Sequence, residues 1–119
     1  MNIQTLAAAM NIAYAVVRVD GFADEESAIL AKEVASYNLS DEQRERVIEA
    51  YKQMNIRQAI SIILESKPED KREAEALTIV ALFGDDELSD KEAGAFVLMS
   101  HILGFEGLKY DEARRIVGF

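Results

Sequence analysis

The chain has 119 residues, half of them hydrophobic, with one proline and neither cysteine nor tryptophan. This length is enough for one domain with its own hydrophobic core, so we expect a single domain over residues 1–119. Without cysteine the chain is neither a disulfide scaffold nor a thiol enzyme, and its composition is typical of a cytoplasmic helical protein. The formal net charge of -9 disfavours nucleic acid and anionic lipid as partners, and it favours cations or basic protein surfaces.

The first apolar segment, Ile3–Val19, predicts a buried central helix. It carries apolar residues at helical spacing and also on the remaining faces. Arg18 and Asp20 interrupt it before the ~20 apolar residues that a membrane span needs, and it lacks the basic region of a signal peptide. We therefore expect no membrane insertion.

Helix caps predict three further helices in the first half. Asp24 is a suitable N-cap for a helix that continues to about Tyr37. Ser40 and Gln43 have the spacing of a capping box, in which side chain and backbone satisfy each other at a helix start. Asn55 is expected to cap a short fourth helix.

The second half begins a similar series. Ser66 and Glu69 have capping-box spacing around Pro68, which suits a first turn, and the apolar pattern continues to Phe83 as a second central helix. Ser89 and Glu92 are the next capping box. Paired glycines then predict a loop, and a short last helix ends at a further glycine (Gly104, Gly107 and Gly118). No segment alternates with period two, so we expect an all-α bundle of about seven helices.

Both central helices continue into short acidic segments, which suggests two pseudo-repeated halves. Aligning Asp20 with Asp86 also superposes Asp24 on Asp90 and Glu26 on Glu92, whereas aligning Asp20 with Asp85 superposes the expected caps Asp24 and Ser89. The repeat is therefore one of helix, acidic turn and helix rather than of individual residues.

These acidic segments are the candidate metal site. Hard divalent cations take roughly 6 to 8 oxygen ligands, so a site needs several carboxylates at short spacing. An all-oxygen set favours Ca²⁺ or Mg²⁺. The candidate ligands are Asp20, Asp24, Glu26, Asp85, Asp86 and Glu92.

Helix capping offers a competing explanation for part of this charge. Acids in a first turn complement the helix dipole, which accounts for Asp24 and Glu92 without any metal. Asp20, Asp85 and Asp86 follow helix C-termini, where negative charge is unfavourable, and capping does not explain them. The segment is not an EF-hand, because a loop that starts at Asp20 has Phe22 at its third position.

The alanine-rich helix that ends in Val19-Asp20-Gly21, the acidic helix start after it, and the segment FGDDELSDKE in the second half together resemble the tellurite-resistance protein B (TerB-like) family. The resemblance covers almost the whole chain. It implies one all-helical domain in two related halves, with acids that bind a divalent metal, and a role in bacterial stress or tellurite-type resistance.

Residue by residue, the resemblance places Asp20 and Gly21 in the first signature, with Asp24 at the cap and Glu26 as the following acid. It places Asp85 and Glu92 in the second signature. Asp86 stands where this second signature usually has glycine, and Ser27 stands where one register expects an acid. One site, or one shared between the halves, is therefore expected rather than two equal sites.

Two other classes of function compete with metal binding. A metal-independent adaptor would use the same acidic face to dock a basic partner protein. An enzyme would need a catalytic constellation, and we expect none: His101 is the single histidine, and the adjacent Ser100 points elsewhere on a helix. The apolar content is compatible with a homo-oligomer.

Overall fold

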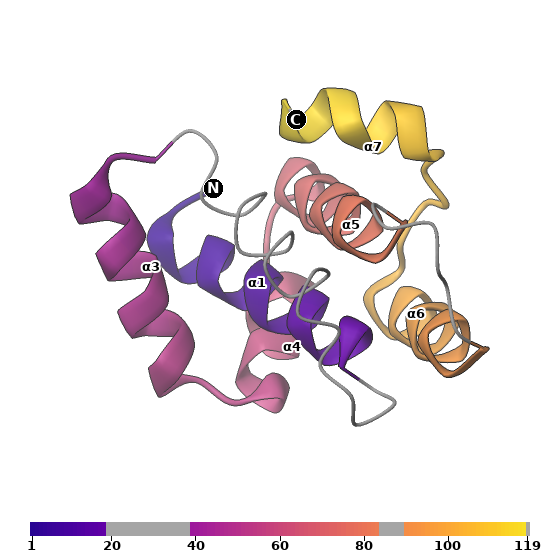
Figure 1. Ribbon diagram of the computed structural model, residues 1–119. Coiled ribbons are helices and arrows are strands. Elements are labelled where there is room, and N and C mark those ends of the chain that lie inside the picture. The colour runs from indigo at the N-terminus through magenta and orange to yellow at the C-terminus, as the bar shows by residue number, and fades with distance from the viewer. Residues whose placement is uncertain (19–38, 84–89, 119) are drawn as a thin grey trace.

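A computed structural model of the protein describes residues 1–18, 39–83 and 90–118. Two helices form the centre of the fold: α1 (Ile3–Val17) and α5 (Pro68–Phe83) (Figure 1). Every residue of α5 from Ala74 to Leu82 is buried, and α1 buries most of its length. Alanines are frequent in both helices, and their small side chains let neighbouring backbones approach closely. The predicted pair of central helices is confirmed.

Two helices cover one side of α1. They are α3 (Asp41–Gln53) and α4 (Ile56–Leu64), and both pack against α1. The predicted capping box of Ser40 and Gln43 opens α3, and Asn55 caps α4 with a second capping box through Gln58. Such caps satisfy the N–H groups that a helix start leaves without partners. These local signals set where the two helices begin.

The start of α5 differs from the prediction in one detail. Pro68 is the first helical residue, as expected, because a proline there loses no helical hydrogen bond. The Ser66 hydroxyl, however, donates to the carbonyl of Ile63 at 2.6 Å, so it closes the C-terminus of α4. Ser66 lies one residue too far from the helix start to be its N-cap, and the predicted capping box with Glu69 was wrong.

The remaining helices lie on the α5 side of the molecule. They are α6 (Asp90–Leu103) and α7 (Tyr110–Val117), and α7 packs along α5 (Figure 1). The loop between them contains Gly104 and Gly107, both at positive φ, and Gly118 ends α7 in the left-handed conformation. The predicted glycine loop and glycine terminator are confirmed.

The part of the chain that the structure describes is all-helical, with six helices and no strand. Its radius of gyration of 12.7 Å is that expected of a compact domain of this length. None of the described helices is long and apolar enough to cross a membrane. The predicted helix from Asp24 to about Tyr37 lies outside the described residues, as do residues 19–38 and 84–89 of the two acidic segments.

Candidate functional site

Glu92 is the one predicted metal ligand that lies within the described residues. It sits in the first turn of α6 with its residue only 6% exposed, while the neighbouring Asp90 is exposed. Among residues 1–18, 39–83 and 90–118, no group of three acidic, histidine or cysteine side chains could hold a metal ion. The other predicted ligands lie outside these ranges: Asp20, Asp24, Glu26, Asp85 and Asp86. The predicted metal site therefore stays a prediction.

The two helices that precede the acidic segments start close together and run in the same direction. The N-terminal ammonium of Met1, just before α1, lies 4.0 Å from the Asp70 carboxylate in the first turn of α5. The helices have 15 and 16 residues, so each is about 22–24 Å long. They pack on each other and run in the same general direction (Figure 1). Their C-terminal residues, Val17 and Phe83, therefore lie on the same side of the molecule.

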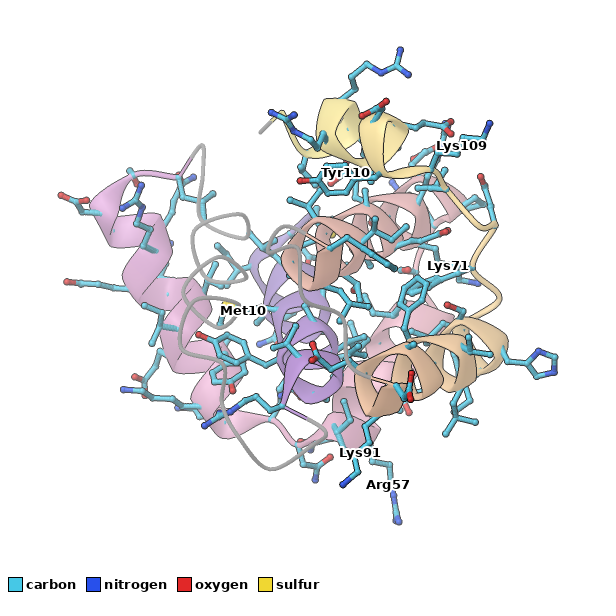
Figure 2. All side chains as sticks on the ribbon, turned by 45° about the vertical axis from the view of Figure 1, so that its right-hand side comes forward. Met10, Arg57, Lys71, Lys91, Lys109 and Tyr110 are labelled. Carbon is cyan, nitrogen blue, oxygen red and sulfur yellow. The ribbon has the colours of Figure 1, made fainter. Side chains whose placement is uncertain are left out.

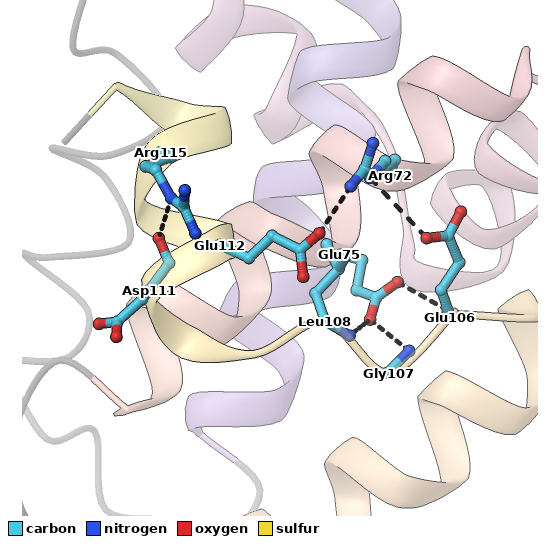
Figure 3. Close-up of polar contacts among 8 residues, drawn as sticks. All are labelled: Arg72, Glu75, Glu106, Gly107, Leu108, Asp111, Glu112 and Arg115. Carbon is cyan, nitrogen blue, oxygen red and sulfur yellow. Dashed lines mark hydrogen bonds and ion pairs between the residues drawn. The ribbon is translucent and has the colours of Figure 1, made fainter.

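A buried carboxylate forms the most extensive polar contact that the structure describes. Glu75, in the buried part of α5, is only 1% exposed. Its two carboxylate oxygens accept hydrogen bonds from the backbone N–H groups of Glu106, Gly107 and Leu108, at 2.7, 2.8 and 2.7 Å (Figure 3). Hydrogen bonds to an ionised acceptor are stronger than neutral ones and offset the cost of burying the charge. Glu75 thus holds the α6–α7 loop against α5.

Arg72 extends the same contact by one turn of α5. Its guanidinium donates to the Glu112 carboxylate at 2.8 Å and lies 3.8 Å from Glu106 (Figure 3). Arg72 and Glu75 are three residues apart and so share a face of the helix. Together they join α5 to the loop and to the first turn of α7.

Sequence reasoning missed this cluster, although it had a visible signal. Glu75 is a lone acid inside the apolar run from Ala74 to Val80, where a charge needs a partner. The partner is a loop with two glycines, whose N–H groups converge only after folding. Since both of its oxygens are already bonded, Glu75 is an anchor for the loop rather than a free ligand or base.

A groove of about 540 Å³ lies among α1, α3 and α4. Its walls carry three glutamines, a serine and Arg57, and no carboxylate lines it. Figure 2 shows Arg57 and Lys91 at the periphery of the molecule, in contrast to Met10, which lies among the helices. The groove offers hydrogen-bonding groups around a partly apolar floor, and it is lined by Gln4, Ala50, Gln53, Met54, Arg57, Gln58, Ser61 and Ile62.

Two tyrosines pack between α1 and α3 beside this region. The rings of Tyr14 and Tyr51 are 5.4 Å apart, and the Arg18 guanidinium lies 5.8 Å from the Tyr14 ring centroid. Burial raises the pKa of Tyr14 above its usual value near 10, Tyr51 adds to the increase, and Arg18 opposes it. Tyr14 therefore stays protonated throughout the physiological range.

Comparison with known proteins supports the fold alone. No protein-family model matches the sequence, and no curated protein matches it significantly. Among solved structures, the crystal structure of a protein of unknown function from Porphyromonas gingivalis is similar, with a TM-score of 0.83. The similarity covers 100% of this chain and 91% of that one, at 19% sequence identity. The helical arrangement thus occurs in another protein, and this likeness carries no information on activity.

Proposed function

We propose that this protein is a TerB-like binding module that takes up a divalent cation, Ca²⁺ or Mg²⁺, in bacterial stress or tellurite-type resistance. The two related halves of that family, in about seven helices, and a cytoplasmic location belong to the same proposal. The observation that supports it best is the parallel packing of α1 and α5, whose C-terminal ends lie on the same side of the molecule.

The sequence that follows each of these ends supplies the ligands. Asp20 comes three residues after Val17, and Asp85 and Asp86 come two and three residues after Phe83. An acid immediately beyond a helix C-terminus is unfavourable for the helix itself, which favours a functional reason for its presence. Two such acidic segments, each following a helix end on the same side of the molecule, offer the several oxygen ligands that a hard cation requires.

Calorimetric titration with Ca²⁺, Mg²⁺, Mn²⁺ and Zn²⁺ tests this proposal. A cation that binds only the folded protein raises its stability, by about 2.7 kcal/mol at a hundredfold excess over the dissociation constant. We expect the combined change Asp20→Asn and Asp85→Asn to remove both the heat of binding and the rise in melting temperature. The matched control is Glu45→Gln on α3, an exposed acid that is not among the predicted ligands. Absence of any response to millimolar cations would refute the proposal.

The alternative is a metal-independent adaptor that docks a basic protein partner. The net charge of -9 favours it, and its docking face is the same pair of acidic segments that the cation would use. A partner captured through these charges stays bound in the presence of a chelator and is released by salt, because exposed charges are screened. Capture that depends on added cation contradicts the adaptor and supports the metal-binding module.

A further inference from the structure

The outer face of α6 exposes large apolar side chains in a row. Val97 is 67% exposed, Leu98 63% and Ile102 45%, although most of α6 is apolar in sequence. Of its apolar residues only Leu103 is fully buried. A helix that is apolar on nearly all faces is ordinarily covered on all of them, so this face is suited to a contact with another molecule.

This face forms a continuous stripe at helical spacing. With 3.6 residues per turn, the exposed residues of the second and later turns fall on one side of the helix. We name this set the α6 stripe, and it consists of Gly94, Val97, Leu98, His101 and Ile102.

The charge pattern favours a second copy of this chain as the molecule that covers the stripe. From Ala93 to Leu103 the sequence contains no aspartate, glutamate, lysine or arginine, in a chain whose net charge is -9. Two copies repel each other over most surfaces, and the repulsion is weakest where the contact carries no carboxylate. The α6 stripe is such a surface, and two identical stripes meet without charge repulsion at the contact.

The pattern of large and small residues favours an antiparallel contact. In a two-fold arrangement centred on Leu98, position 94 of one copy faces position 102 of the other, because both are four residues from the centre. A Cβ added at Gly94 would meet nothing within 4 Å, so this position has room for the Ile102 side chain of the second copy.

We propose that the α6 stripe is a homodimer interface in which two copies of α6 pack antiparallel about a two-fold axis at Leu98. A helix of 14 residues is about 21 Å long, enough for the apolar centre of an interface of ordinary size. This proposal is independent of metal binding.

Disulfide formation tests the geometry directly, because the chain has no cysteine of its own. A residue on a two-fold axis faces its own copy, so Leu98→Cys is expected to give a covalent dimer on mild oxidation. The matched control is Glu45→Cys on α3, which is exposed on a helix far from α6 and is expected to give no covalent dimer (Figure 1). Equal cross-linking of the two variants, or none with Leu98→Cys, would overturn the antiparallel register.

Sedimentation equilibrium tests the association itself. Leu98→Glu places a like charge at the centre of the contact in both copies, and we expect the dimer dissociation constant to rise at least ~10-fold. Leu64→Glu is the same change at another exposed leucine, 44% exposed at the end of α4, and should leave the constant unchanged. A wild-type protein that stays monomeric at millimolar concentration, or equal losses in both variants, would refute the interface.

Discussion

Helices α5 and α6 are similar in length and rich in apolar residues, yet they differ sharply in burial. In α5 nine consecutive residues, from Ala74 to Leu82, are buried, and one of them is the charged Glu75. In α6 only Glu92 and Leu103 are buried, while Val97 and Leu98 are among the most exposed apolar residues that the structure describes. The two helices therefore have comparable apolar sequences and opposite surroundings.

The difference comes from where each helix lies. Helix α5 lies between α1 and α7 and packs along both, so side chains on several of its faces leave the solvent. Helix α6 lies at the edge of the molecule (Figure 1). Its Phe96 ring packs against the rings of Phe83 and Phe105, with centroids 6.0 and 6.5 Å apart. An apolar helix sequence therefore predicts that the faces of the helix are covered. The packing of the other helices decides whether they are covered by the same chain or left for another molecule.

The largest expected effect compares one leucine from each helix. Leu82 in α5 is 0% exposed, so Leu82→Ala removes buried methyl groups and leaves a cavity, at a cost of about 2–5 kcal/mol. Leu98→Ala in α6 should change the free energy of unfolding by no more than about 0.5 kcal/mol at low protein concentration. Denaturant unfolding of both variants measures the difference. Similar losses from the two changes would mean that α6 is as buried as α5 in solution.

The next effect concerns the buried charge of α5. Glu75→Gln replaces one acceptor oxygen by an NH₂ group that faces backbone donors, so we expect a loss of about 2–3 kcal/mol. Amide hydrogen exchange should accelerate at residues 106–108 in particular. A general loss of packing would instead accelerate exchange throughout the protein.

The control for this change is Glu69→Gln, an exposed acid at the start of the same helix, which should cost no more than about 0.5 kcal/mol. A Glu75→Gln protein with unchanged exchange in the loop would contradict the anchoring role of Glu75.

The smallest expected effects come from alanine substitutions at two glycines, and the two changes in stability should have opposite signs. Gly107 has φ of 85°, so Gly107→Ala forces a side chain into the left-handed region and is expected to cost about 1–2 kcal/mol. Gly94 is helical with nothing near an added Cβ in the single chain, so at low protein concentration Gly94→Ala should stabilise the protein by roughly 0.5–1 kcal/mol. Thermal melts of the two variants report the sign. Stabilisation by Gly107→Ala would show that the loop adopts another conformation in solution.

Local signals in the sequence predicted much of the described fold. The capping box of Ser40 and Gln43, the cap at Asn55 and the terminator at Gly118 each depend on residues within one turn, and all were confirmed. The wrong prediction at Ser66 also depended on a single position. Because α5 starts one residue later than predicted, the Ser66 hydroxyl bonds to the end of α4 instead of the start of α5. Helix boundaries depend on such single positions.

The candidate site was less predictable, because its parts are distant in the sequence. The capping pattern predicted that Glu92 lies in the first turn of α6, but it did not predict that the side chain is buried, because a capping acid can equally well be exposed to solvent. The anchor at Glu75 joins residues more than thirty positions apart, and no local pattern marks the three donors. The role of Asp20, Asp85 and Asp86 stays a prediction from the sequence, to be decided by the cation titration.

The sequence by itself determined that this protein is helical, which segments are most apolar, and where several helices begin and end. These properties follow from side-chain spacing and caps, which act over one or two turns. Only the tertiary structure decided that α1 and α5 lie side by side in the same direction, that Glu75 holds the α6–α7 loop, and that α6 keeps an apolar face exposed. Each of these depends on which distant segments meet, and that is settled by packing the whole chain into one compact volume.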